Sequence, residues 1–360
     1  MSEIVTNSAV TFVNNKTPAK ITSEEIDLNA CFTDDEIVVE IHAAALNPVD
    51  FLLHSFAYSF ILNSKPKVYS RDYSGVVIRA GKNVGKWKVG DKVTGMFDHV
   101  YGDRGALSNY LILNPNKNVA IARLAKFDDE KYDDFILNAA WPLVFGTAYS
   151  ALLKQGQTLG PESKVLVIGA STSVSNAFIQ IAKHHLHIGT VVGVSSKASM
   201  EHNKELGFDY MVPYNDGSAV EHVKDLIKNK LNNEKFDLIF DSVGNSDFYP
   251  LHDTFLKPKN EGSLYATIVG DSKFNYLNPS LWDILPNFHI FKRYGPFKCY
   301  NYSNFLLHPL SEYMELGVEM IEKGEYKPAI DSVYDFKDFQ QALDRIRSNK
   351  AKGKVVIRLK

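Results

Sequence analysis

A hydroxyl-rich loop at residues 169–175 carries the clearest chemical signal in the chain. It follows a short apolar run, residues 164–168, typical of a strand buried on both faces of a parallel sheet. An amphipathic stretch, residues 174–187, comes next. In an open α/β sheet, such a strand-to-helix turn offers backbone N–H groups to the pyrophosphate of a dinucleotide. The loop therefore predicts nucleotide binding by Gly169, Ala170, Ser171, Thr172, Ser173 and Val174.

The same loop departs from the Gly-x-Gly-x-x-Gly fingerprint of dinucleotide sites. Ala170, Thr172 and Ser175 occupy the three glycine positions. If Thr172 has to adopt a positive φ, the strain is about 1–2 kcal/mol, roughly a tenfold loss of affinity. Its side chain could also stand where the backbone approaches the phosphates. Four hydroxyls and a helix N-terminus still make an anion cradle, and a helix cap without a ligand is the alternative.

A second alternative for the loop is the nucleophile elbow of a serine hydrolase. Residues 169–173 would match Gly-x-Ser-x-Gly if Ser173 were a glycine. An acid and a histidine must follow, and Asp241 and His289 occur in that order. The missing glycine argues against this alternative, because the strained turn needs it.

The end of the next strand indicates which nucleotide would bind. An NAD enzyme usually places Asp or Glu here to hold the ribose 2′-hydroxyl. This chain has Ser195, Ser196 and Lys197 instead, and no carboxylate among them. Hydroxyls and a lysine would attract a 2′-phosphate, so NADPH is favoured over NADH. An exposed helix start is the alternative.

These residues belong to a chain whose pattern changes at about residue 160. Before it, short β-rich runs alternate with Gly and Pro turns, which predicts a mostly β, barrel-like domain. After it, strands alternate with helices, which predicts right-handed crossovers and a doubly wound parallel sheet. The fold class is therefore α/β. The last residues, 353–359, form an edge-like strand that could pair with either domain.

Composition excludes several classes of protein. The 360 residues carry a formal net charge of −2, so no global field attracts nucleic acid. Cys31 and Cys299 are too few for a disulfide scaffold or a four-thiolate zinc site.

The N-terminus has no signal-peptide pattern, and Asn, Pro and Gly within residues 135–153 favour a core segment over a membrane span. His184, His185 and His187 suit the C-terminus of a helix better than a metal site.

Several segments, in the order in which they occur along the chain, resemble the zinc-free, quinone-oxidoreductase-like branch of the medium-chain dehydrogenase/reductase superfamily. They cover nearly the whole chain: residues 43–50, 71–77, 87–93, 105–110, 147–149, 164–171, 237–244 and 353–356. Residues 69–75 and 170–175 look like the fungal Yim-type members of this branch. The resemblance implies a GroES-like β-barrel-type catalytic domain, residues 1–130 completed by 305–360, and a Rossmann domain, residues 131–304.

The resemblance also implies a chemistry, namely hydride transfer from NADPH, bound in an interdomain cleft, to a quinone or an α,β-unsaturated carbonyl. Asn47 and Asp50 would line the cleft near the nicotinamide, and Tyr58 falls near the family's active-site tyrosine. Asn47 and Asp50 could equally be structural turn residues. The remaining carried-over cofactor residues are Thr147 on the nicotinamide side, Lys197 and Tyr214 near the adenosine phosphate, and Lys354 after the glycine of the closing strand.

Two departures from the family pattern matter. The zinc-dependent branch needs a cysteine ligand and a Gly-His-Glu step, and the region of Asp72 has neither, so no metal site is expected. The altered glycine loop leaves open a degenerate member that binds nucleotide weakly or not at all and acts as a scaffold or regulator at an organelle surface. A cytoplasmic protein is expected, and the resemblance leaves open a homodimer and peripheral association with an organelle surface, that of lipid droplets or mitochondria.

Overall fold

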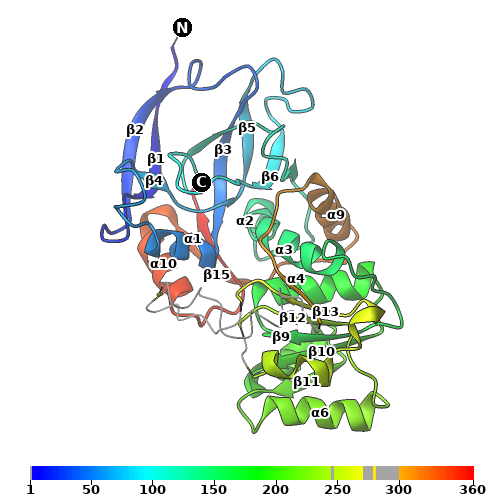
Figure 1. Ribbon diagram of the computed structural model, residues 1–360. Coiled ribbons are helices and arrows are strands. Elements are labelled where there is room, and N and C mark those ends of the chain that lie inside the picture. The colour runs from blue at the N-terminus through cyan, green and yellow to red at the C-terminus, as the bar shows by residue number, and fades with distance from the viewer. Residues whose placement is uncertain (1, 245–246, 271–278, 281–299) are drawn as a thin grey trace. The chain divides into compact units, whose positions relative to one another are not determined.

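The computed structural model describes residues 2–244, 247–270, 279–280 and 300–360, and the chain divides into two compact units (Figure 1). Unit 1 comprises Met1–Gly146 with His308–Lys360, and unit 2 comprises Thr147–Leu307. Residues 131–146 therefore fall in unit 1, although the expected boundary gave them to the second domain. The reason is packing, because α2 (Asp134–Ala139) buries Ile136 and Ala139 against Ala43, Ala45 and Val356 of unit 1.

Unit 1 is built mainly from β-strands, which confirms the GroES-like half of the predicted fold. A three-stranded sheet has the order β2-β1-β4, and a seven-stranded sheet has the order β15-β16-β3-β5-β6-β8 with β7 also paired to β3. The strands are β1 (Ile4–Phe12), β2 (Lys20–Asp27), β3 (Ile37–Leu46), β4 (Lys67–Val68), β5 (Asp72–Ala80), β6 (Lys92–Met96), β7 (Tyr110–Leu113), β8 (Ile121–Arg123), β15 (Ile330–Asp335) and β16 (Lys354–Arg358). The helices are α1 (Pro48–Ser55), α2, α9 (Ser311–Glu322) and α10 (Phe339–Arg347).

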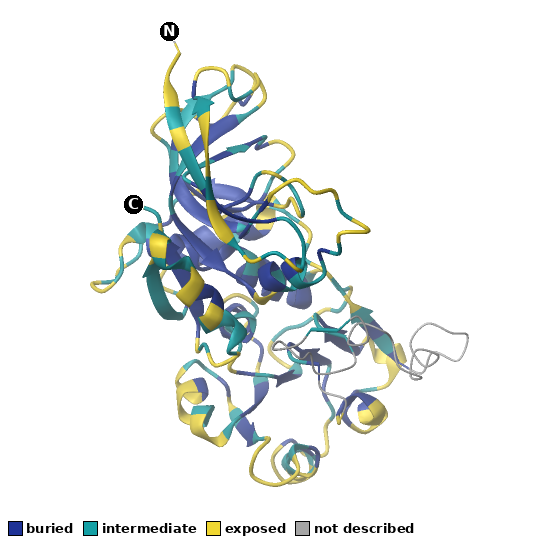
Figure 2. Cartoon of the chain, turned by 90° about the vertical axis from the view of Figure 1, so that its left-hand side faces the viewer, coloured by how far each residue is buried: buried dark blue, intermediate teal, exposed yellow. Residues whose placement is uncertain are grey.

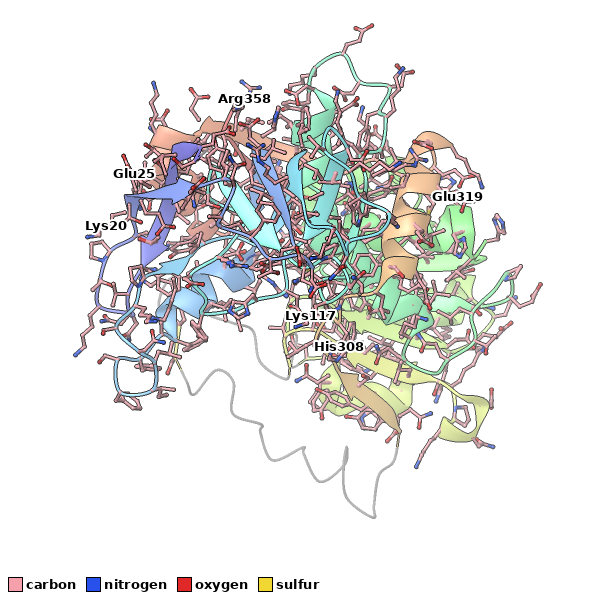
Figure 3. All side chains as sticks on the ribbon, turned by 90° about the horizontal axis from the view of Figure 1, so that it is seen from above. Lys20, Glu25, Lys117, His308, Glu319 and Arg358 are labelled. Atoms are coloured by element: carbon pink, nitrogen blue, oxygen red, sulfur yellow. The ribbon has the colours of Figure 1, made fainter. Side chains whose placement is uncertain are left out.

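The C-terminal strand was expected at an edge, and the structure corrects this. β16 lies between β15 and β3, with Val356 opposite Ala45 and Ile357 opposite Ala44. Its residues Val355, Val356 and Ile357 are fully buried, as an interior strand requires. The edges of this sheet are β15 and β8. In the three-stranded sheet, β2 is an exposed edge strand, and charged side chains such as Lys20 and Glu25 on it (Figure 3) discourage pairing with another chain.

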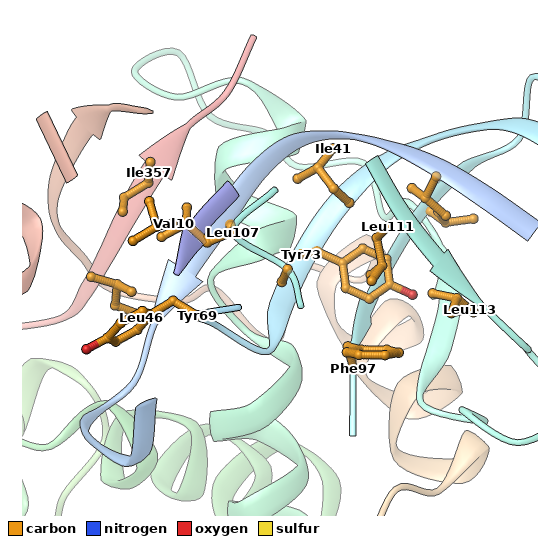
Figure 4. Close-up of a cluster of buried hydrophobic side chains, with 14 of the residues drawn as sticks. Val10, Ile41, Leu46, Tyr69, Tyr73, Phe97, Leu107, Leu111, Leu113 and Ile357 are labelled. Atoms are coloured by element: carbon orange, nitrogen blue, oxygen red, sulfur yellow. The ribbon is translucent and has the colours of Figure 1, made fainter. Parts of the chain in front are cut away.

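The core of unit 1 follows from the two-residue period of its strands. Alternate residues of β3, such as Val39 and Ile41, are buried in one cluster with Tyr73 of β5 and Leu111 of β7. Figure 4 shows Ile41, Tyr73 and Leu111 of this cluster. Ile357 of β16 joins the same cluster, so the last residues of the chain contribute to a core formed largely by the first 125.

Unit 2 holds a six-stranded sheet in which every pair of neighbouring strands is parallel, and this confirms the Rossmann-type half of the fold. Its order is β11-β10-β9-β12-β13-β14, so the direction of winding reverses beside β9. The strands are β9 (Lys164–Ile168), β10 (Thr190–Ser195), β11 (Tyr210–Pro213), β12 (Leu238–Asp241), β13 (Leu264–Thr267) and β14 (Asn301–Asn304). Among its described residues the helices are α4 (Ser173–Gln180), α5 (Met200–Glu205), α6 (Ala219–Lys230) and α7 (His252–Phe255). Helices α5, α6 and α7 each carry exposed residues, whereas α4 and most of the strand residues are buried or half-buried (Figure 2).

The helix expected at residues 174–187 is shorter than its pattern indicates. Helix α4 ends at Gln180, a π-helical turn follows at Ile181–His185, and His187 takes a positive φ of 54°. Lys183, rather than a histidine, satisfies carbonyls there, because its Nζ donates to Ile188 O at 2.9 Å and Gly189 O at 3.3 Å.

The uncharged segment at residues 135–153 is split between α2 and α3 (Pro142–Leu153). Within the described ranges, no helix is long and apolar enough to cross a membrane.

Candidate functional site

The loop between β9 and α4 turns on Gly169. This residue has a φ of +86°, a conformation that L-residues with side chains rarely adopt. A Cβ here would stand 2.5 Å from Val243 Cγ1 and 2.6 Å from Ser242 Oγ. Both the backbone conformation and the close approach of the loop after β12 therefore require glycine at this position.

Thr172 does not carry the strain that the glycine fingerprint suggested. Its φ is −75°, because the left-handed conformation falls on Gly169 instead. Thr172 is the N-cap of α4, and its Oγ1 accepts from the N–H of Ser175 at 3.1 Å. The side chain is thereby turned toward the helix start, so the sequence-based reason for a tenfold loss of affinity is wrong.

Three hydroxyls form a small cluster behind this cap. Thr172 Oγ1 lies 3.0 Å from Ser175 Oγ and 3.1 Å from Ser242 Oγ, and the two serine oxygens are 3.2 Å apart. Ser242 follows β12, the strand beside β9 on the side where the winding reverses. Sequence reasoning missed Ser242, since it lies about 70 residues from its partners.

The carboxylate of Asp241 fixes the loop that carries Ser242. Its Oδ1 accepts from the N–H groups of Val243 at 3.0 Å and Gly244 at 2.8 Å, and its Oδ2 accepts from the Tyr265 hydroxyl at 2.9 Å. Through these contacts Asp241 holds the loop after β12 in place. The other member of the hydrolase alternative, His289, lies outside the described residues.

The geometry of this loop fits a phosphate group. The first N–H groups of a helix have no intrahelical acceptor, and Thr172 occupies only that of Ser175. The N–H groups of Ser173 and Val174 remain at the positive end of the helix dipole, where an anion is favoured. Ser171 is exposed beside them, with its Oγ held by Asn203 Nδ2 at 3.0 Å.

The structure gathers the adenosine-side candidates at the ends of β10 and β11. Tyr214 N–H donates to Ser195 O at 3.0 Å, and the N–H of Lys197 donates to Asn215 Oδ1 at 2.9 Å. Ser196 begins the short turn that carries Lys197, and its Oγ is 3.1 Å from Ser199 Oγ. Tyr214 is 56% exposed.

A carboxylate does lie beside Lys197, although none was expected near the end of β10. Lys197 Nζ donates to Asp216 Oδ2 at 2.7 Å, and this hydrogen bond raises the pKa of Lys197 and lowers that of Asp216. Asp216 lies in the loop after β11. The residues next to β10 in the sequence therefore gave no sign of it. Both side chains are more than half exposed, so the pair is weak and open to exchange.

Unit 1 brings three predicted site residues together around one that was not predicted. Asp72, at the start of β5, is fully buried, and its Oδ2 accepts from Asn47 Nδ2 at 2.8 Å and from Lys354 Nζ at 2.9 Å. Lys354 Nζ also donates to Asn47 Oδ1 at 2.6 Å. Asp50 lies next to this group and accepts from the N–H of Asn47 at 2.7 Å. We call Asn47, Asp50, Asp72 and Lys354 the buried polar cluster.

The cluster gives Asn47 and Asp50 a structural role as well. Asn47 is the N-cap of α1 and Asp50 is the third residue of the helix, so the turn-residue alternative holds in the local geometry. Burial raises the pKa of Asp50 to about 7, although the N–H of Asn47 opposes this, and the charge of Asp72 raises it further. Asp50 is thus a carboxyl group that exchanges its proton near neutral pH.

Tyr58 lies away from the cluster, beyond the other end of α1. Its ring is 5.4 Å from that of Phe60 between centroids, and among the described residues no hydrogen bond or ring contact joins it to Asn47, Asp50 or Lys354. The loop that carries Tyr58 is anchored by Lys67, which is 1% exposed. Lys67 Nζ donates to the carbonyls of Val13, Asn63 and Lys65 at 3.0, 2.8 and 2.8 Å.

We expect Lys67→Met to loosen this loop, because three carbonyls lose the donor that this side chain supplies. The free energy of unfolding should fall by about 1–3 kcal/mol, and amide hydrogen exchange at residues 58–66 should accelerate. Lys82→Met is the control, since Lys82 pairs with Asp34 on the surface and its loss should change little. Unchanged exchange at residues 58–66 would mean that Lys67 does not anchor the loop.

The remaining candidates are placed as follows. Thr147 is buried on α3, directly after the point where unit 1 ends. No group of three or more His, Cys, Asp or Glu that could hold a metal ion occurs among the residues that the structure describes. Cys31 is partly buried with a raised pKa caused mainly by burial, and Cys299 lies outside the described residues.

Comparisons with known proteins cover the full length of the chain. Residues 206–357 match the family described as zinc-binding dehydrogenase, and residues 33–123 match the alcohol dehydrogenase GroES-like domain. The chain is 58% identical to protein YIM1-1 of Lachancea thermotolerans, over 100% of both chains. It is 56% identical to protein YIM1 of Saccharomyces cerevisiae, over 99% of both chains.

A solved structure shares the fold at low sequence identity. The Escherichia coli quinone oxidoreductase, solved in complex with NADPH, superimposes with a TM-score of 0.75 at 20% identity, over 99% of this chain and 100% of that one. At this identity the similarity shows the fold alone.

Proposed function

The chain belongs to the medium-chain dehydrogenase/reductase superfamily, and from this premise we propose that it is an NADPH-dependent, zinc-independent oxidoreductase. Its substrate is a quinone or an α,β-unsaturated carbonyl. The observation that carries the proposal is the loop of Gly169: a glycine turn, a capped helix and free helix N–H groups at the carboxyl end of the parallel sheet, beside the reversal of winding.

Each binding residue has a defined task in this proposal. Gly169 lets the chain turn, and the N–H groups of Ser173 and Val174 hold the pyrophosphate with help from Ser171. Lys197 exchanges Asp216 for the 2′-phosphate, while Tyr214 and the two serines at the end of β10 line the adenosine side. Thr147 and the buried polar cluster serve the nicotinamide side.

Bound NADPH supplies the hydride. The protein has to orient the acceptor, exclude water and stabilise negative charge on the substrate oxygen. Tyr58 has the hydroxyl for this last task by its position in the family pattern, and the described part of the chain offers that hydroxyl no hydrogen-bond partner. A quinone takes its protons from solvent, so no dedicated acid is required for that substrate.

The test of this function is a screen for NADPH oxidation with soluble quinones and enones. The purified protein should consume NADPH in stoichiometric proportion to the acceptor, and Gly169→Ala should lower this activity strongly at micromolar NADPH. A chain that binds NADPH and transfers no hydride to either class would contradict the reductase proposal while leaving cofactor binding intact.

The pair of Lys197 and Asp216 should set the preference between the two nicotinamide cofactors. We expect Lys197→Ala to weaken NADPH binding about tenfold and to leave NADH binding unchanged, because only NADPH carries a 2′-phosphate that can contact the Lys197 ammonium group. Asp216→Asn should strengthen NADPH binding a few-fold by removing a competing carboxylate. Titration calorimetry measures both, with exposed Lys204→Ala as the control. Equal losses for NADPH and NADH would show that Lys197 does not contact the 2′-phosphate.

The cellular expectations remain predictions. A cytoplasmic location, a homodimer and association with lipid droplets or mitochondria would be tested by imaging a tagged chain and by size-exclusion chromatography.

A further inference from the structure

We propose that Asp72 is a positioning residue that holds three segments of the reaction site in register. This inference rests on the function proposed above. Asp72 is 0% exposed, and its two carboxylate oxygens accept from three different places in unit 1. Two are Asn47 and Lys354 of the buried polar cluster, and the third is the N–H of Leu143, at 2.9 Å from Oδ1.

The first segment is the start of α1, where Asp72 fixes the side chain of Asn47. An amide has a donor end and an acceptor end, and here each has one charged partner. Lys354 donates to Oδ1, and Asp72 accepts from Nδ2. A flipped amide would set Nδ2 against the ammonium group and Oδ1 against the carboxylate, so one orientation is enforced. One of the two Nδ2 protons is thus assigned to Asp72, and the other is left for a carbonyl group of the bound substrate or nicotinamide.

The second segment is the last strand of the chain. Lys354 is 3% exposed and begins β16, 282 residues after Asp72. A buried ammonium group needs a counter-ion, and Asp72 supplies it. The ion pair therefore sets the register at which the C-terminal strand enters the sheet beside Asn47.

The third segment is the first turn of α3. Asp72 accepts an N–H that the helix itself cannot satisfy, and a carboxylate is favourable at this end of the helix dipole. Thr147 lies four residues after Leu143, one turn further on the same face of the helix. Asp72 thereby orients the turn that leads to Thr147.

The experiment separates positioning from mere stability with charge-matched variants. Asp72→Asn alone leaves the Lys354 charge buried without its carboxylate, and Lys354→Gln alone leaves the Asp72 charge buried without its ammonium group. Both single variants should be less stable in urea, and their kcat should fall at least tenfold with little change in KM. The double variant D72N/K354Q removes both charges together, so its stability should recover. Its kcat should stay low, because neutral partners no longer force one amide orientation.

The control is Asp331→Asn, which breaks the ion pair with Arg345 elsewhere in unit 1 and should lower stability without lowering kcat. Recovery of kcat together with stability in the double variant would overturn the positioning role.

A second readout does not depend on catalysis. In protein labelled with ¹⁵N-asparagine, the side-chain amide of Asn47, identified by its loss in Asn47→Ser, should be protected from hydrogen exchange in the wild type and unprotected in the double variant. An unprotected amide in the wild type would overturn the inference. If the wild type transfers no hydride, the proposed function fails, while this readout still decides whether Asp72 fixes Asn47.

Discussion

Alanine at position 169 is expected to remove most of the affinity for NADPH. The backbone there has a φ of +86°, which places a strain of about 1–2 kcal/mol on any residue with a Cβ. The added carbon would also overlap Val243 and Ser242, and such overpacking costs a further 1–3 kcal/mol or so. The loop can relieve the overlap only by moving away from the helix N-terminus, so NADPH binding should weaken roughly 30- to 100-fold.

The control for this prediction is Gly156→Ala in the same unit. Gly156 has a nearly identical φ of +89°, yet a Cβ there would meet no atom within 4 Å. It should lose stability through backbone strain alone and keep its affinity for NADPH. Calorimetric titration and urea unfolding of both variants provide the comparison. Similar NADPH affinity in Gly169→Ala and wild type would show that the phosphates bind elsewhere.

Replacing Asp50 by asparagine should change the pH dependence of stability. The folded protein raises the pKa of Asp50 to about 7 from an ordinary value of 3.8. Between these values the folded state holds a proton that the unfolded state releases, so rising pH favours unfolding. The wild type should therefore lose roughly 3–4 kcal/mol through this group between pH 4 and pH 8. The amide of the variant has no such proton to release, and its oxygen can still accept from the N–H of Asn47.

Urea unfolding of wild type and Asp50→Asn from pH 5 to pH 8.5 measures this effect. As the pH rises toward 7, the free energy of unfolding of the variant should increase steadily relative to that of the wild type. Above pH 7 the difference between the two should become constant. Asp331→Asn is the opposite control, because Arg345 lowers the pKa of Asp331 to about 2 and its contribution should be constant in this range. A constant gap for Asp50→Asn as well would mean that Asp50 is already ionised in the folded protein at pH 5.

Local patterns predicted the elements of unit 2 well. The buried apolar run before Gly169 became β9, and the expected alternation of strands and helices follows it. The position of the helix start was predictable too, since Thr172 is a favourable N-cap. What the glycine fingerprint could not show is which residue takes the positive φ, because that depends on how close the loop after β12 approaches.

The contacts that sequence reasoning missed come from residues far apart in the chain. Asp216 reaches Lys197 only because β11 pairs with β10 in parallel. Asp72 meets Lys354 only because β16 inserts between β15 and β3. Asp72 lies within a family-like segment, residues 71–77, and Asp216 lies in none, but in both cases the partner becomes apparent only from the pairing of the strands. The family pattern pointed to Asn47 and Lys354 individually, and the structure adds that one buried carboxylate holds both.

The most direct test of the account is a calorimetric titration of NADPH, and separately of NADH, into the purified protein. We expect micromolar binding of NADPH and much weaker binding of NADH, because the capped helix holds the pyrophosphate and Lys197 recognises the 2′-phosphate. Absence of binding for both nucleotides at millimolar concentration would contradict the account. The hydroxyl-rich loop would then be a helix cap without a ligand, and the chain would be a degenerate family member that acts as a scaffold or regulator.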